Sequence, residues 1–400
     1  MINYQTTIDR FYQYLIVAAF FLLPLTVSLN NIAIWLTVLL FLFSGDYVEK
    51  LHKIRKNKLA LASILFFTIH VAGLFWSTNL AWGLEMVRKM LPFLFVLPVL
   101  LTITRKDNIK YYIGAFLLGI SISETLSYLI WFEVIDVFKY ATVDNPTPLM
   151  SHVSYNPFLA FAIYLVLNKL FSGEKMTQIE RATYTFFSVT MTINMFITGG
   201  RAGQVMFFAA IVIVVFQYFK KSQVKAIVTS TLLIVVISYT AFNSSPMFQT
   251  RVINAFDNVL NYEEERNTSV GQRITFLTNS WKMFLNAPVI GVGTGDFPGE
   301  YKKISVVNSP GVRTTNQPHN MYMLVLSQLG LVGLGSFLLI FYFQFKLALA
   351  LPILYIKNIG VAMPLLFLII MWSDSYLLGH FTGNLFILFS SFVYSSNIND

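Results

Sequence analysis

An arginine stands at the start of a long apolar run, with glycines on both sides of it. In FITGGRAGQVMFFAAIVIVV, residues 196–215, Arg201 is the only charged residue, and Gly199, Gly200 and Gly203 surround it. Glycines allow a sharp turn and the close approach of another molecule. A guanidinium group binds oxyanions through paired hydrogen bonds, and a helix N-terminus also favours negative charge. We therefore predict that Arg201 binds an anion, with Gly200 and Gly203 in support.

Three further cations are predicted to lie on the same side of the membrane as Arg201, according to the topology given below. Arg273 opens a predicted amphipathic helix, and Arg88 and Lys89 lie in LEMVRKMLPF at the start of an apolar segment. Each has an ordinary alternative. Arg88 and Lys89 could extend their charged ends to lipid headgroups, and Arg273 could be a solvated loop residue.

A histidine and a carboxylate are the candidates for proton transfer. His319 lies between Pro318 and Asn320 in NQPHNMYMLVLSQLG, where an apolar run begins. A neutral histidine with a pKa of about 6.5 can take a proton from a hydroxyl at neutral pH. It can equally be a structural hydrogen-bonding residue. Asp374, in MWSDSYLLGH, lies in an apolar segment and needs a partner, which could be His319 or an arginine. Glu124 is a second carboxyl of this kind.

Motifs for other chemistries are absent from the sequence. There is no cysteine, no HExxH and no DxD, so a metal mechanism is not expected. GVGTGD, residues 291–296, resembles a nucleotide-binding loop but lacks the spacing and the following lysine. We interpret it as a turn and expect no cofactor.

The composition identifies the class of protein that carries these residues. The 400-residue chain is 56% hydrophobic and 12% charged, with a mean hydropathy of +0.64, whereas soluble domains have about 25% charged residues. It is therefore an integral membrane protein. The net charge of +9 reports on topology, and we expect no nucleic-acid binding. The run 11–29 is interpreted as a retained first helix, because no cleavage site follows it.

Apolar runs predict about twelve membrane-spanning helices in one all-α domain, residues 1–400. The second and fourth runs are short for a span, which needs about 20 residues. The runs lie at 11–29, 31–44, 59–76, 90–104, 111–131, 149–169, 182–198, 201–219, 226–243, 319–344, 360–376 and 381–395.

The distribution of basic residues predicts the orientation of these spans. Lysines and arginines cluster in the connection 45–58 and in alternate connections after it, which places both termini in the cytoplasm. One long loop, residues 244–318, then lies on the outer face before the last three spans. It contains a predicted amphipathic helix, GQRITFLTNSWKMFLNAP. Arg88, Arg201, Arg273 and His319 all face this side.

Together, the arginines, the membrane location and the histidine indicate a class of substrate. Arginines suit a pyrophosphate, a membrane site suits a lipid tail, and a histidine suits activation of an acceptor hydroxyl. A lipid-pyrophosphate glycosyl donor fits all three, and it needs neither nucleotide nor metal because arginines can stabilise the leaving pyrophosphate.

Three segments resemble the O-antigen ligase/O-antigen polymerase family of bacterial inner-membrane glycosyltransferases. They are TGGRAG, GQRITFLTNSWKMFLNAPVIGVGTGDF and HNMYMLVLSQLGLVGL, and the resemblance covers about residues 195–335. SHVSYNPFLAFA, residues 151–162, adds to it. Gly200 is a departure, since many members have serine there.

The resemblance implies a fold of the membrane-embedded, lipid-donor (GT-C) type and an active site on the periplasmic face. The family's ligases move O-antigen from undecaprenyl pyrophosphate to a sugar hydroxyl of lipid A–core, without a metal and with inversion. By position, His319 would be the base, supported by Asn320 and Asp374. Arg201 and Arg273 would hold the pyrophosphate, helped by Arg88.

Three alternatives stay open. A polymerase would extend the lipid-linked glycan, but polymerases tend to have two sizeable outer loops, and the next largest here, 132–148, is short. A ligase that glycosylates proteins is the second. A flippase for lipid-linked glycans is the third; transporters usually have repeated halves, and none is evident in the sequence.

Overall fold

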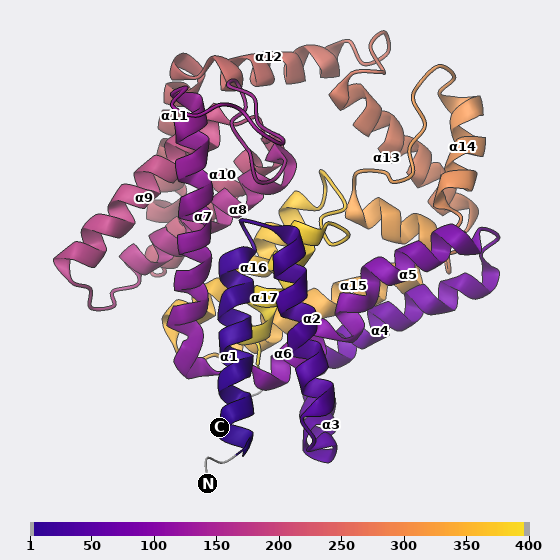
Figure 1. The fold of residues 1–400 in the computed structure, drawn as a ribbon. Coiled ribbons are helices and arrows are strands. Elements are labelled where there is room, and N and C mark those ends of the chain that lie inside the picture. Colours follow the sequence, from indigo (N-terminus) through magenta and orange to yellow (C-terminus); the bar gives the residue numbers. More distant parts are fainter. Residues whose placement is uncertain (1–3, 396–400) are drawn as a thin grey trace.

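A computed structural model describes residues 4–395 and shows a chain built from helices (Figure 1). The described residues form seventeen α-helices, two short 3-10 helices and no strand. The N-terminal half contains α1 (Tyr4–Leu22), α2 (Val27–Phe43), α3 (Tyr47–Lys56), α4 (Lys58–Ala72), η1 (Gly73–Trp76), α5 (Leu80–Leu94), α6 (Val96–Ile103), η2 (Lys106–Asn108), α7 (Ile109–Trp131), α8 (His152–Phe171) and α9 (Gln178–Ile197).

The C-terminal half contains the segments that carry most of the candidate site. Its helices are α10 (Arg201–Tyr218), α11 (Gln223–Ser244), α12 (Pro246–Leu260), α13 (Ser269–Asn286), α14 (Phe297–Asn308), α15 (Met321–Ala350), α16 (Leu354–Ile370) and α17 (His380–Val393).

Six helical segments of the described chain are long and apolar enough to cross a membrane, which agrees with a multi-pass membrane protein. They are Lys58–Trp76, Leu80–Ile103, Lys106–Trp131, Arg201–Tyr218, Gln223–Ser244 and Met321–Ala350. Three shorter apolar helices, α2, α16 and α17, accompany them. The prediction of about twelve spans remains a prediction.

Prolines move two predicted helix boundaries. The run 11–29 was expected to be one helix, but α1 ends at Leu22 and α2 begins at Val27, with Pro24 between them. The run 90–104 contains the end of α5 and all of α6, and the break precedes Pro98. Proline lacks a backbone N–H and clashes with the preceding turn, so it interrupts a helix that hydropathy alone would continue.

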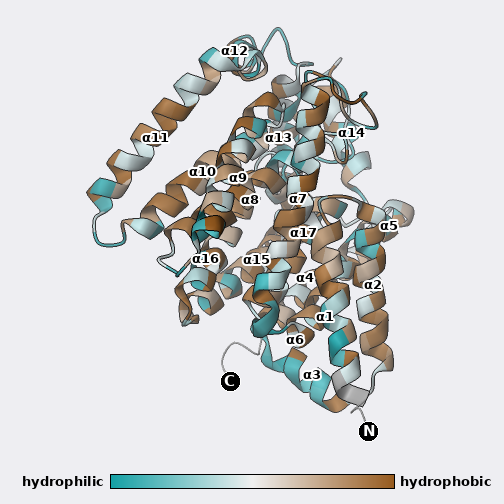
Figure 2. Cartoon of the chain, turned by 60° about the vertical axis from the view of Figure 1, so that its left-hand side comes forward, coloured by the Kyte–Doolittle hydropathy of each residue, from teal (hydrophilic) through white to brown (hydrophobic). Residues whose placement is uncertain are grey.

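Helix α8 is the centre of the packing. Every residue from Tyr155 to Leu165 is buried, and the helix contacts α7, α9, α10, α16 and α17. Apolar residues also cover the outer surfaces of the helices, whereas α3 is largely hydrophilic (Figure 2). A helix that is apolar on all sides belongs inside a bundle, and apolar outer surfaces suit a lipid environment.

The long loop is folded into helices. The predicted amphipathic helix is α13, and the loop also contains α12 and α14, which were not predicted. These helices lie at the opposite end of the molecule from α3 and both ends of the described chain (Figures 1 and 2). This separation is the one that the predicted topology requires.

A kink in α15 contacts the segment that follows α13. Gly330 interrupts α15 with a φ of 60°, and a side chain there would overlap the backbone of Val289. The loop backbone bonds to the kink, with Leu331 N–H donating to the carbonyl of Pro288 at 2.9 Å and Gly293 N–H to that of Gln328 at 2.9 Å. Glycine is required here because other residues disfavour a positive φ.

The GVGTGD segment is a structural clamp between the loop and the membrane helices. Thr294 Oγ1 donates to the carbonyl of His70 in α4 at 2.7 Å. The buried carboxylate of Asp296 accepts hydrogen bonds from the backbone N–H groups of Thr78 and Asn79, at 2.8–3.0 Å, just before α5. The segment is therefore a turn, as interpreted from the sequence, and its polar groups bind protein.

Candidate active site

His319 forms a pair with Asp374. The two side chains meet through Nδ1 and Oδ1 at 3.2 Å, and they are 34% and 19% exposed. The imidazole ring stacks on Phe276 of α13, with ring centres 6.0 Å apart and planes 25° apart. His319 has a left-handed φ of 50°, which is uncommon for a residue other than glycine.

Asn320 holds this backbone in place. Its side chain caps α15 by accepting from the N–H of Met323 at 3.0 Å and donates to the carbonyl of Trp372 at 3.1 Å. The next N–H, of Met321, donates to the carbonyl of Met371 at 2.9 Å. The start of α15 is thus fixed to the end of α16, which places His319 beside Asp374.

The pairing defines what the imidazole can do. A carboxylate accepts a hydrogen bond from Nδ1–H, so the neutral ring keeps a lone pair on Nε2. Nε2 has no hydrogen-bond partner among the described residues. Asp374 is held in turn by the N–H of Ser375, at 2.7 Å. The arrangement is that of an oriented general base.

Three arginines gather around a neighbouring cavity of about 330 Å³, hereafter the arginine cavity. Arg201 comes from α10, Arg251 from α12 and Arg273 from α13; His152 and Tyr376 also line it, and no aspartate or glutamate does. The structure shows no hydrogen bond or ion pair between any of the three guanidinium groups and another described residue. Nε of Arg201 is buried without a partner.

Such a set of cations requires an anion. Arginines that lie close together repel each other unless negative charge neutralises them, and each offers the planar donor pattern that suits phosphate oxygens. Arg201 is the first residue of an 18-residue helix, whose N-terminus adds to the attraction. The lining of the cavity therefore suits a multiply charged oxyanion.

The glycines beside Arg201 serve helix packing. Side chains at Gly200 and Gly203 would overlap Asn156 of α8, and one at Gly199 would lie 3.0 Å from the guanidinium of Arg251. From the sequence, Gly200 and Gly203 were expected to make room for another molecule. In the structure they instead let α10 pack closely against α8. Asn145 adds a link, accepting from the N–H of Gly199 and bonding to His152, both at 2.9 Å.

Arg88 is not brought to the arginine cavity. It is exposed and lines a separate cavity of about 220 Å³ that also contains His380. Its neighbour Lys89 borders that cavity too, and in addition a cavity of about 290 Å³ that contains Asp374, hereafter the second cavity. The second cavity shares Val153 and Tyr376 with the arginine cavity, so Asp374 and the arginines line adjoining cavities, whereas His319 lines neither of them.

Comparison with known proteins indicates a family for part of the chain. Residues 186–338 match the family model described as O-antigen ligase. The match supports the O-antigen ligase/polymerase family for this part of the chain. Members of the family are glycosyltransferase-type enzymes that act on lipid-linked glycans. The matched segment carries Arg201, Arg251, Arg273 and His319.

A curated relative is an uncharacterized protein of Haemophilus influenzae. It is 26% identical over 227 residues, which covers 54% of this chain and 54% of the relative. The chain thus spans about half the length of this relative.

Arg251 is the site residue that the sequence reasoning missed. The signal was available, because Arg251 lies in the same long loop as Arg273 and would face the same side. It was not distinguished from the other loop cations, since α12 was not predicted. Asp374, by contrast, was recognised, and the structure selects His319 as its partner.

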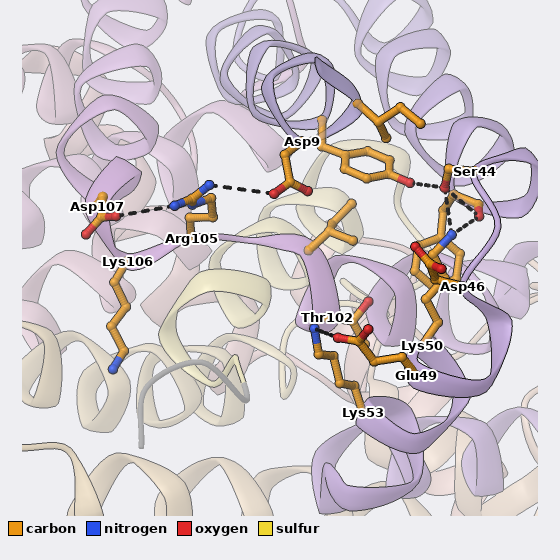
Figure 3. A pocket seen from close by; sticks show the side chains of 14 residues that line it. Asp9, Ser44, Asp46, Glu49, Lys50, Lys53, Thr102, Arg105, Lys106 and Asp107 are labelled. Atoms are coloured by element: carbon orange, nitrogen blue, oxygen red, sulfur yellow. Dashed lines mark hydrogen bonds and ion pairs between the residues drawn. The ribbon is translucent and has the colours of Figure 1, made fainter. Parts of the chain in front are cut away.

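A charged cavity at the opposite end of the protein differs from the candidate site. It measures about 550 Å³ and is lined by α1, α2, α3 and residues 102–107. Its charges pair with one another, as in Asp9–Arg105 at 3.6 Å and Glu49–Lys53 at 2.8 Å (Figure 3). Paired charges leave no net attraction for a ligand, so this cavity is not the candidate site.

Proposed function

We propose that this protein is an O-antigen ligase. It transfers O-antigen from undecaprenyl pyrophosphate to a sugar hydroxyl of lipid A–core, and the site faces the periplasm from the bacterial inner membrane. The observation that carries the proposal is the set of three arginines without protein partners, next to an oriented histidine. Cations for a leaving pyrophosphate and a base for an acceptor hydroxyl are the two requirements of this reaction.

The proposed reaction follows from the geometry. Asp374 holds the imidazole through Nδ1, and Nε2 takes the proton of the acceptor hydroxyl. The acceptor oxygen bonds to the anomeric carbon as the bond between that carbon and the pyrophosphate oxygen breaks, which inverts the centre. Arg201, Arg251 and Arg273 stabilise the charge that develops on the pyrophosphate. The guanidinium groups supply the positive charge, so the proposal includes no metal or nucleotide.

The outer segments favour a ligase over a polymerase. Residues 132–151, between α7 and α8, contain no helix, whereas the long loop contains three. A polymerase that holds two long glycans on the outer face would be expected to have two folded outer segments. Polymerase activity is the second candidate, because it uses the same donor.

The deciding experiment compares acceptors. Purified protein is incubated with lipid-linked O-antigen, with and without lipid A–core, and the products are separated on a gel. Glycan on lipid A–core, with no change when it is omitted, supports the ligase. Longer lipid-linked chains in both samples would establish a polymerase. Transport of the lipid-linked glycan across vesicles without any transfer would overturn the enzyme and indicate a flippase.

A further inference from the structure

The second cavity has a lining that differs from that of its neighbour. It lies between α5, α8, α15 and the segment before α17, and its volume is about 290 Å³. We propose that it binds an uncharged sugar residue of the acceptor, which rests on the proposed glycosyl transfer. Asp374, which pairs with His319, lines this cavity, so a sugar bound there lies against the partner of the base.

The charges of the second cavity are already paired. Lys89 Nζ lies 2.9 Å from Glu85 Oε1, one turn earlier in α5, and Asp374 is paired with His319. The arginine cavity, in contrast, contains three cations and no carboxylate. A phosphorylated or carboxylated group gains little attraction in a balanced site, whereas a neutral polyol loses nothing there.

Buried polar atoms in the second cavity lack partners. Nε1 of Trp82, Oγ of Ser375 and Oη of Tyr376 are buried and form no hydrogen bond with a described residue. Ser375 and Tyr376 are each only 4% exposed. An unsatisfied buried donor or acceptor costs about 1–3 kcal/mol, so such groups indicate a polar ligand or water.

A sugar ring matches this lining. Its hydroxyls donate and accept hydrogen bonds, and its C–H faces pack on aromatic rings. Trp82 supplies a partly buried ring, with Lys89 Nζ 5.6 Å from the ring centre. Tyr376 lines both cavities, so this residue lies between the proposed acceptor and donor sites.

The test separates the two cavities by kinetics. Trp82→Leu and Tyr376→Phe are compared with Arg201→Lys, using lipid A–core as acceptor and undecaprenyl-pyrophosphate-linked O-antigen as donor. Loss of one or two hydrogen bonds predicts a rise of about 5- to 10-fold in the acceptor KM of the first two variants. The donor KM of Trp82→Leu stays within about twofold of the wild type, whereas Arg201→Lys raises mainly the donor KM.

Two controls complete the design. Tyr140→Phe removes a hydroxyl from an exposed tyrosine outside the cavities described above, and it leaves both KM values unchanged. Lipid A–core freed of its phosphates should keep its KM within about twofold. Tyr376→Phe changes a single atom, so it tests the subsite even where Trp82→Leu fails to fold.

The outcomes are distinct. An unchanged acceptor KM in folded Tyr376→Phe and Trp82→Leu would overturn the subsite while leaving the ligase standing. A tenfold weaker dephosphorylated acceptor would show that the acceptor is recognised by charge. A wild-type protein that transfers no glycan would overturn the proposed function and this subsite with it.

Discussion

At the scale of single residues, His319 occupies a backbone conformation that costs free energy. A left-handed residue other than glycine is tolerated where its surroundings fix it, and such positions cluster at functional sites. Here Asn320 fixes the backbone and Asp374 fixes the ring. The same fold could hold a glycine at 319 with less strain, so the imidazole itself is the group that is required.

We expect His319→Ala to lower kcat by at least about 100-fold, because a general base contributes about 10²- to 10⁴-fold. The thermal unfolding of the variant should stay near that of the wild type, since the side chain is one-third exposed. Turnover of the purified variant with lipid A–core measures the effect. His52→Ala, on exposed residue 52 of α3, is the control and stays active. Near wild-type turnover in His319→Ala would remove this residue from the mechanism.

Arg251 gives a separate prediction. Arg251→Gln should raise the donor KM about 10- to 100-fold, because hydrogen bonds to charged groups contribute about 1.5–3 kcal/mol. The matched control is Arg313→Gln, which removes the same charge from an exposed part of the long loop. Equal effects of the two changes would mean that only the overall charge of the loop matters.

At this scale, the sequence could not show which of the candidate residues pair with one another. Arg201, Arg273, His319 and Asp374 were found by their type and by the side of the membrane that they face. The pairing of His319 with Asp374 depends on the backbone bonds between the ends of α15 and α16, which join positions about 50 residues apart. Arg88 and Lys89 show the same limit, since helix rotation decides which of two neighbours borders the second cavity.

At the scale of elements, the GVGTGD segment and the kink at Gly330 fix the long loop to the bundle. We expect Gly330→Ala to destabilise the protein by at least about 2 kcal/mol, because the φ of 60° with a ψ of −156° is a backbone conformation open essentially to glycine alone, at a cost of about 1–3 kcal/mol for other residues, and because the added Cβ overlaps the backbone of Val289. Gly335→Ala, in the same helix with open space around the added carbon, should cost nothing. Thermal unfolding in detergent compares them, and equal stability would refute the requirement for a kink.

Hydropathy predicted helices where apolar residues recur at helical spacing. It missed helix ends and breaks whose positions are set by capping residues and prolines. Helix α13 was predicted because apolar residues recur along it at helical spacing. Helix α12 was not predicted, although it is no less apolar than α13, and its start is set locally by Pro246 and by the Ser245 side chain, which accepts from the N–H of Phe248. Helix α14 is shorter and less apolar. The breaks near Pro24 and Pro98 lie inside continuous apolar runs, where hydropathy carries no signal.

At the scale of the whole molecule, the candidate site and the basic helix α3 occupy opposite ends. The chain has no cysteine, so single cysteines can report topology without background. We expect Lys302→Cys, on exposed residue 302 of α14, to react with an impermeant maleimide in cells with a permeabilised outer membrane. Arg55→Cys, in α3, should react only after lysis. The opposite pattern would invert the predicted orientation.

The expected response to metal removal also depends on the molecule as a whole. The described residues contain no group of three or more histidines, aspartates or glutamates placed to hold an ion. We therefore expect glycan transfer to continue in EDTA, because the arginines provide the charge. Activity lost in EDTA and restored by a divalent cation would reveal a site formed by other means.

The three arginines of the arginine cavity come from two different parts of the molecule. Arg201 belongs to the bundle, whereas Arg251 and Arg273 belong to the loop above it. Without a counterion, their mutual repulsion opposes the seating of the loop. A pyrophosphate held by all three joins the two parts, and its binding free energy adds to the stability of the fold. Under the proposed function, the carrier lipid is thus expected to stabilise the fold as well, so the protein should resist heat best when the lipid-linked donor is plentiful and unfold more readily as the membrane is depleted of it.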